Sequence, residues 1–378
     1  MDEIKNNLYS REIFTYGKES IEKIINLKIL IYGLRGLGIE IAKNLILSGP
    51  KEISIFDNTI CAINDLSSNF YLEEKDINKQ RRDEACLEKL SSLNPFVKVS
   101  LCKEQNLSKA VLNYDCIVIT EIMKTESLFK LNEICRNNRI GFIYTGNLGL
   151  IGFGFIDFGK KHIITNESGD ENLFYFIKSI IKKEKTYEIY LDEEDDTTFK
   201  LVDNDYVKFK EIKGLEELNN DEPKKIKIMS RYHISIENNN INNNTYISGG
   251  IVEEVKIPIE LNFLSFKEQF FIPNENEAQI KLDKSKMYVN ELIHCGIVAL
   301  HQYYDKFNNL PGQNDMTQSA IVIDFAKKFY ENAVSKELNW IKIKKNKNKN
   351  EKYIPFNEDY ILKIIRWSNC EINPICSF

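Results

Sequence analysis

The chain has 378 residues, of which 43% are hydrophobic and 28% charged, and its formal net charge is −5 at pH 7. Such a chain can form two or three domains that each bury a core. Its negative charge argues against general binding to nucleic acid or to anionic membranes, so we expect neither as a partner. No apolar run reaches the roughly 18 to 20 residues that span a bilayer, and we expect no signal peptide.

The cysteines and histidines predict no metal site. None of the eight cysteines belongs to a C-x-x-C pair, which argues against structural zinc. His294 and His301 are seven residues apart in a helical pattern and could share one face, but a buried, hydrogen-bonded role suits them better than metal binding. Cysteines scattered through apolar runs are typical of a reduced, intracellular protein.

Strands and helices alternate through the first part of the chain. A helical segment over 8–27 precedes a buried strand at 28–34, a helix over 37–48 and a second strand at 51–57. The elements predicted next are a helix at 84–96, strands at 97–104 and 115–121, a helix at 129–138 and two strands within 140–159. This alternation predicts a doubly wound α/β sheet.

The pattern changes after about residue 166. Short alternating strands lie at 187–193, 207–212, 225–230 and 232–236, which indicates a small β-barrel or sandwich inserted into the α/β domain. Helical patterns resume at 291–307, 319–334 and 359–369. The predicted division is therefore into residues 1–166, an inserted β-rich domain over 167–253, and a helical continuation over 254–378.

A glycine-rich turn joins the first buried strand to the helix that follows it. Gly33, Gly36 and Gly38 have the G-x-x-G-x-G spacing that lets a backbone approach a phosphate at a helix N-terminus. Asp57 ends the next strand, where a ribose-binding carboxylate would lie. These four residues form the candidate nucleotide pocket. Arg35 places a long charged side chain inside the turn, so protein could fill this pocket in place of a ligand.

Five ordered motifs resemble the N-terminal half of the ubiquitin-activating enzyme: LYSREIFTYGKESIEKI, GLRGLGIEIAKNLILSG, DLSSNFYLEEKDINK, GGIVEEVKIP and EINP. The similarity runs through nearly the whole chain. It implies a Rossmann-like adenylation (ThiF-type) fold that forms an inactive adenylation domain, with a first catalytic-cysteine half-domain inserted in it. It also implies that this sequence is a truncated piece of a longer enzyme.

The resemblance implies that this adenylation site has lost its chemistry. Active members carry an Asn-Arg-Gln-Phe run whose arginine contacts ATP, whereas this chain reads Ser-Ser-Asn-Phe at 67–70. The family's active-site lysine falls near Arg81, and its magnesium-handling aspartate falls near Ile122. Acyl adenylation needs magnesium and cations around a triphosphate. We therefore expect ATP and Mg in the intact enzyme but no cofactor bound to this chain.

One functional residue matches a family motif. Arg11 corresponds to an arginine that the inactive half lends in trans to ATP bound by the active half; the plainer alternative is an arginine that caps or salt-bridges its own helix. The family reaction, of the ligase class, adenylates the ubiquitin C-terminus and then forms a thioester. The implied partners are the active adenylation half, ubiquitin and ubiquitin-conjugating enzymes, with a homodimer of this chain as a further possibility. The implied location is the cytoplasm and nucleus.

The inserted domain contains no catalytic nucleophile, because no cysteine lies between Cys135 and Cys295. Cys370 and Cys376 are interpreted as packing residues. Two other functions stay open. One is the regulatory subunit of a heterodimeric activating enzyme for a small ubiquitin-like modifier, although such subunits typically lack the inserted domain. The other is an oxidoreductase that binds NAD(H) at the glycine turn, which Arg35 and the missing His/Lys constellation argue against.

Overall fold

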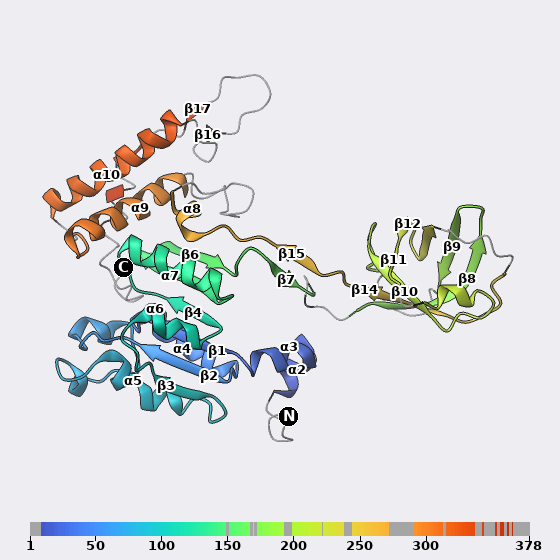
Figure 1. Ribbon diagram of the computed structural model, residues 1–378, viewed down its shortest axis with the longest axis horizontal. Coiled ribbons are helices and arrows are strands. Elements are labelled where there is room, and N and C mark those ends of the chain that lie inside the picture. The colour runs from blue at the N-terminus through green and yellow to red at the C-terminus, as the bar shows by residue number, and fades with distance from the viewer. Residues whose placement is uncertain are drawn as a thin grey trace. The chain divides into compact units, whose positions relative to one another are not determined.

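The chain folds into two compact units (Figure 1). The α/β unit comprises residues 22–162 and 262–378, and the barrel unit comprises residues 1–21 and 163–261. The computed structural model describes residues 9–148, 151–166, 169, 172–192, 199–220, 222–237, 244–271, 290–312, 315–336, 342–343, 352–353, 356–358, 361–362 and 365.

The α/β unit alternates strands and helices before it ends in longer helices. Its strands are β1 (Lys28–Tyr32), β2 (Glu52–Phe56), β3 (Lys98–Leu101), β4 (Cys116–Ile119), β5 (Gly141–Leu148), β6 (Ile151–Asp157), β16 (Lys342–Ile343) and β17 (Lys352–Tyr353). Its helices are α4 (Gly36–Leu47), α5 (Arg82–Ser91), α6 (Leu107–Ala110), α7 (Thr125–Asn137), α8 (Phe266–Phe271), α9 (Asn290–Phe307) and α10 (Met316–Ser335). Short 3-10 turns are η1 (Ile63–Ser67), η2 (Glu74–Asp76) and η3 (Val111–Asn113).

A six-stranded sheet forms the centre of the α/β unit, in the order β3-β2-β1-β4-β5-β6 (Figure 1). Its strands run parallel except for β6, which is antiparallel to β5. Because side chains alternate along a strand, Ile29 and Ile31 of β1 join a core with α4 and α5, whereas Leu30 joins a second core with α7 and α8. Helices therefore cover both faces, and the prediction of a doubly wound, Rossmann-like sheet is confirmed.

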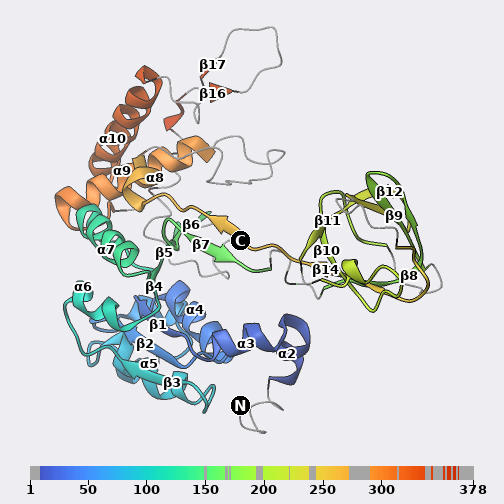
Figure 2. The same cartoon turned by 45° about the vertical axis from the view of Figure 1, so that its right-hand side comes forward.

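Two histidines, the half-buried His294 and the buried His301, connect α9 to the rest of the α/β unit. His294 Nε2 lies 3.0 Å from the carbonyl oxygen of Phe270 on α8, and His301 Nε2 lies 3.0 Å from the hydroxyl of Tyr144 on β5. The other side of α9 packs along α10 (Figure 2). Both histidines are thus hydrogen-bonded as predicted, His301 at a buried position and His294 at a half-buried one.

The barrel unit is built mainly from short antiparallel strands. They are β8 (Phe174–Lys182), β9 (Thr186–Leu191), β10 (Tyr206–Lys210), β11 (Lys224–Lys225), β12 (Lys227–Ser230), β13 (His233–Glu237), β14 (Ile251–Val255) and β15 (Ile259–Leu261). The unit also contains α2 (Ser10–Tyr16) and the turn η4 (Glu216–Leu218), while α3 (Lys18–Ile24) and β7 (His162–Ile164) extend into the α/β unit.

Seven of these strands form one curled sheet, in the order β11-β10-β14-β8-β9-β13-β12. The first and last strands in this order, β11 and β12, are separated in the chain only by Ile226, which is buried. The Ile226 amide donates to the Asp205 carbonyl, and its carbonyl accepts from Asn204. The two edges therefore meet at one residue, which nearly closes the sheet into a barrel around an apolar core (Figure 2). This confirms the predicted barrel-like insertion.

Several local details differ from the predicted elements. The helical segment predicted over 8–27 is two helices, α2 and α3, because Gly17 ends α2 with a φ of +78°. The short aromatic helix α8 was not predicted, since six residues carry too little periodicity. The helix predicted over 359–369 lies mostly outside the described residues. Among the described residues, no helix is long and apolar enough to cross a membrane.

We expect the α/β unit to lose stability as the pH falls from about 6.5 to about 4. Burial lowers the pKa of His294 and of His301 to about 4. Folding therefore favours the neutral imidazoles. Between the ordinary histidine pKa of about 6.5 and the lowered value of about 4, the unfolded chain binds more protons than the folded chain. Each histidine should contribute up to about 1.4 kcal/mol per pH unit to the decline in the free energy of unfolding, measured by urea titration.

Carboxylates also titrate in this range, so the histidine contribution is read from variants. His294→Leu and His301→Leu should each flatten the pH dependence of the free energy of unfolding. An unaltered slope in both variants would contradict this account.

Candidate functional site

A cavity of about 750 Å³ lies at the carboxyl edge of the central sheet, within the α/β unit. Its walls are the glycine turn, residues that follow η1, the ends of β2 and β4, β5, and α9 with the loop after it. Ligands in open α/β sheets bind in the crevice at this edge. The cavity brings together Gly33, Gly36, Gly38 and Asp57, the four residues of the candidate nucleotide pocket.

Atoms of neighbouring residues pack closely against the glycine turn. A Cβ atom on Gly33, whose φ is +93°, would lie 2.4 Å from Cγ of Glu121, and one on Gly36 would lie 2.7 Å from Cβ of Ser68. A Cβ atom on Gly38 would lie 2.0 Å from the carbonyl oxygen of Gly33. Contacts inside the protein therefore require these glycines, whether or not a ligand binds.

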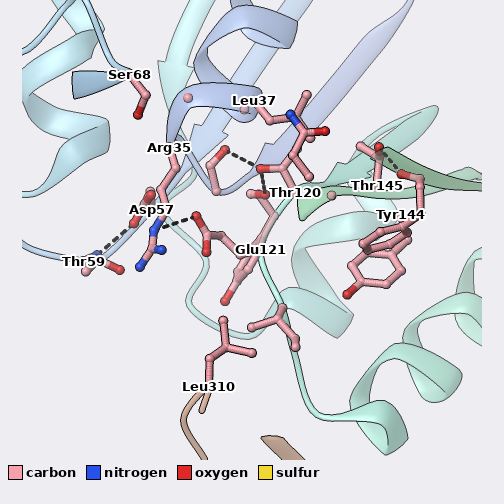
Figure 3. A pocket seen from close by; sticks show the side chains of 18 of the residues that line it. Arg35, Leu37, Asp57, Thr59, Ser68, Thr120, Glu121, Tyr144, Thr145 and Leu310 are labelled. Carbon is pink, nitrogen blue, oxygen red and sulfur yellow. Dashed lines mark hydrogen bonds and ion pairs between the residues drawn. The ribbon is translucent and has the colours of Figure 1, made fainter. Parts of the chain in front are cut away.

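Glu121 occupies the position above the turn where a phosphate would approach. It follows β4, and its carboxylate forms an ion pair with Arg35, with 3.3 Å between Oε1 and Nε (Figure 3). Arg35 is the N-cap of α4, and a helix N-terminus attracts negative charge. Glu121 supplies that negative charge from within the chain, so an incoming phosphate would meet a carboxylate.

Asp57 has its hydrogen-bonding capacity taken up by protein. Its Oδ2 accepts the Leu34 amide at 2.9 Å, and its Oδ1 accepts the Thr59 amide at 3.0 Å (Figure 3). Nη1 of Arg82 lies 3.2 and 3.4 Å from the two oxygens. Two oxygens that already accept four contacts have little capacity left for ribose hydroxyls.

Arg82 is the centre of a buried ionic cluster behind Asp57. Its Nε donates to Asp65 at 2.7 Å, and all three side chains are no more than 3% exposed. Asp65 also accepts the Ala62 amide, which closes η1 onto this cluster. Asn69, which follows η1, also connects this segment to the glycine turn, because its side-chain amide donates a hydrogen bond to the Leu34 carbonyl. The buried charges thus fix the turn, η1 and β2 to one another.

Aromatic side chains form part of the cavity wall. Tyr32 stacks on Phe56 with 5.6 Å between ring centroids, and Tyr144 packs edge-on against Phe153 at 5.3 Å. Burial, and next the charge of Glu121, raises the pKa of both tyrosines, so their hydroxyls stay neutral. His301 holds the Tyr144 hydroxyl in place.

These residues do not fit a magnesium-bound triphosphate. Ile122, which the family resemblance places at the magnesium-handling position, lines the cavity, and its side chain cannot bind a metal. Ser67 and Ser68, which the resemblance aligns with the run that carries the ATP-contacting arginine, also line it, and neither carries a positive charge. Arg81 pairs with Asp83 instead of reaching into the cavity. Among the described residues, no group of three His, Cys, Asp or Glu side chains could hold a metal ion.

The sequence patterns missed the residues that decide the character of this cavity. Glu121 lies next to Ile122 and follows a strand adjacent to β1, so the rule that ligands bind at the carboxyl ends of strands could have drawn attention to it. Arg82 is adjacent to Arg81, and nothing in the sequence distinguishes the buried arginine from the partly exposed one. Arg11 lies on α2 in the barrel unit, where it is exposed.

We expect Gly38→Ala to lower the free energy of unfolding by about 1–3 kcal/mol, because the added methyl group overlaps the Gly33 carbonyl. The matched control is Gly154→Ala on β6, where the nearest atom is 3.8 Å away and the expected change is below about 1 kcal/mol. Urea unfolding without nucleotide measures both. Equal effects would show that the turn glycines have no packing role.

We expect Arg82→Met to cost about 3–5 kcal/mol, because it leaves the carboxylates of Asp57 and Asp65 buried without their cation. Lys98→Met removes an exposed ion pair with Glu52 and should cost less than about 1 kcal/mol. Chemical denaturation at pH 7 compares the two. A loss below 1 kcal/mol for Arg82→Met would mean that the cluster does not hold the site together.

Models of three protein families match consecutive parts of the chain. The ThiF family matches residues 9–162, the ubiquitin-activating enzyme E1 FCCH domain matches 190–256, and the ubiquitin-activating enzyme E1 four-helix bundle matches 257–330. The first match covers the central sheet, the second covers most barrel strands, and the third covers α8, α9 and most of α10. Two of the three families are thus specific to E1 enzymes.

Curated relatives agree with these matches. Ubiquitin-activating enzyme E1 1 of Candida albicans is 37% identical over 305 residues, which is 80% of this chain and 28% of that protein. Ubiquitin-like modifier-activating enzyme 1 of Homo sapiens is 32% identical over 86% of this chain and 30% of that protein. The chain thus spans about three tenths of the length of these relatives.

Among solved structures, Escherichia coli MccB with succinimide is 24% identical over 41% of this chain and 49% of that chain, with a TM-score of 0.36. The E1-specific family matches and the identity to E1 enzymes over at least 80% of the sequence decide the assignment. The chain belongs to the ubiquitin-activating enzyme E1 family.

Proposed function

We propose that this chain is the inactive adenylation part of a ubiquitin-activating enzyme, which supports an active adenylation half without performing chemistry itself. The observation that carries this proposal is the position of Glu121 over the glycine turn, paired with Arg35. A carboxylate at the phosphate position repels ATP. The engagement of Asp57 with Arg82 removes the group that would bind ribose.

The intact enzyme would adenylate the ubiquitin C-terminus with ATP and Mg bound in the active half, and then form a ubiquitin thioester for transfer to ubiquitin-conjugating enzymes. This chain would act in the cytoplasm and nucleus. Cys86, Cys116 and Cys135 are poor nucleophiles, since burial raises the pKa of each thiol to about 12. The thioester would therefore form on a cysteine outside this chain.

Residues 167–253 would be the first catalytic-cysteine half-domain and would help to hold ubiquitin. The match of the FCCH family to residues 190–256 supports this reading over a regulatory subunit for a small ubiquitin-like modifier, which typically lacks the inserted domain. The barrel then contributes a binding surface and no nucleophile, because no cysteine lies between Cys135 and Cys295.

The segment around η1 would contact the active half. Ile60, Ile63 and Phe70 lie within this segment and are 47%, 73% and 79% exposed. Large apolar side chains gathered on one exposed segment are typical of a protein interface. When the active half is absent, two copies of this chain would pair through the same surface and form a homodimer.

Arg11 would reach ATP in the active half. Its side chain is exposed on α2 and, within the described part of the chain, forms no ion pair. This leaves its guanidinium available for a bidentate contact to phosphate in trans. The assignment rests on the match of its motif to the E1 family.

We expect calorimetric titration of ATP–Mg into this chain alone to show no binding, because Glu121 occupies the phosphate position. Mixing the chain with the separately expressed active half should restore binding and ubiquitin adenylation. In that mixture Arg11→Ala should slow adenylation at least tenfold, while Lys18→Ala, on the neighbouring exposed helix, should not.

Micromolar binding of ATP by the chain alone would overturn the inactive assignment. Equal rates for Arg11→Ala and Lys18→Ala would remove Arg11 from the reaction and leave only the supporting role.

A further inference from the structure

The cavity at the carboxyl edge of the sheet has room for a small molecule. Its volume of about 750 Å³ lies within the range of about 300–1,000 Å³ that is usual for ligand pockets. One part of its wall comes from β5, β6 and α9, and we call this part the aromatic wall. Its members are residues 144–147, Phe153, Ile297, Leu300, His301 and Tyr304. Figure 3 shows the ring of Tyr144 beside this space.

The aromatic wall combines rings from three elements. Tyr144 of β5 packs edge-on against Phe153 of β6 and against His301 of α9, with 5.3 and 5.7 Å between ring centroids. Leu300 and Tyr304 are four residues apart on α9 and therefore share one face of the helix with His301. Aromatic rings attract a further ring beyond the simple burial of area, because their faces and edges carry opposite partial charges.

Hydroxyl groups on the cavity wall already have partners inside the protein. The Thr145 hydroxyl donates to the Phe153 carbonyl at 2.7 Å, and the Tyr144 hydroxyl lies 3.0 Å from Nε2 of His301. The Thr120 hydroxyl lies within 3.2 Å of two backbone carbonyl oxygens. A ligand would have to replace these hydrogen bonds, so exchanging them gains little free energy. Apolar and ring contacts are then the main source of affinity on this wall.

The aromatic wall is uncharged at pH 7. None of its members is an aspartate, glutamate, lysine or arginine. Burial lowers the pKa of His301 to about 4, so its imidazole is neutral. A charged group placed on an apolar wall loses its hydration without gaining a counter-ion there, which is unfavourable. The wall therefore favours an uncharged ligand.

We propose that this cavity is a binding site for an uncharged aromatic molecule, held against the aromatic wall by ring and apolar contacts. Tyr144, Phe153 and Tyr304 supply the rings, and Leu300 supplies an aliphatic surface. This site goes beyond a supporting role in ubiquitin activation and does not depend on it. It uses the crevice of the adenylation fold for a ligand that needs neither a phosphate-binding turn nor a metal.

The test uses the full chain and three probes of similar shape. The probe 2-naphthalenemethanol is uncharged and aromatic, its decahydro analogue is uncharged and saturated, and 2-naphthoate is the aromatic anion. In calorimetric titrations at pH 7 we expect the first to bind about two- to tenfold more tightly than the saturated analogue. It should bind at least tenfold more tightly than the anion.

No binding of 2-naphthalenemethanol at millimolar concentration would overturn the proposal. Affinity for either of the other probes that equals or exceeds its affinity would do the same. Neither result would affect the supporting role, which is tested with ATP–Mg and the active half.

A variant locates the probe. Tyr304→Leu removes one ring from the wall and should weaken binding of 2-naphthalenemethanol about threefold while changing the affinity of the saturated analogue less. The matched control is Tyr16→Leu on α2, where the tyrosine is 58% exposed and outside the cavity, and it should change neither affinity. An unaltered preference for the aromatic probe in a folded Tyr304→Leu variant would place the probe elsewhere. The comparison of probes on the unmodified chain decides the proposal even if Tyr304→Leu fails to fold.

Discussion

The guanidinium of Arg82, buried between the carboxylates of Asp57 and Asp65, is the contact on which the carboxyl edge of the sheet depends. It ties the end of β2 to the turn η1, while Asp57 in turn accepts the amide of Leu34 in the glycine turn. The end of β2, η1 and the glycine turn are thereby fixed to one another. The low dielectric around these charges makes the arrangement rigid but also intolerant of a missing partner.

The contact between Arg82 and Asp57 also affects how a nucleotide-type fold can bind a ligand. A carboxylate at the end of the second strand ordinarily faces a ligand, but here its oxygens face Arg82 and two backbone amides. With Glu121 placed over the glycines, the fold keeps its crevice and loses both anchors for a nucleotide. This geometry supports the proposal that the chain keeps the shape of an adenylation domain without its reaction, since function resides in sites and not in folds.

The sequence was informative wherever local pattern determines structure. The run from β1 through the glycine turn and α4 to Asp57 was predictable, because strand alternation, helix periodicity and glycine spacing all act within about 30 residues. The roles of Glu121 and Arg82 were not predictable, because each depends on a partner brought near by the fold: Arg35 lies 86 positions before Glu121 in the chain, and Asp57 lies 25 positions before Arg82. The barrel-like insertion was predictable from its short alternating strands, whereas the strand order that nearly closes it was not, because that order depends on long-range pairing.

Ile226 has a consequence for the solution behaviour of the protein. A sheet that ends in long free edges offers unpaired backbone groups to other chains and so risks aggregation. In the barrel unit the two outermost strands, β11 and β12, are only two and four residues long and continue into each other through this buried residue. The edges therefore shield one another, and an antiparallel sheet of seven strands leaves little backbone exposed for intermolecular pairing.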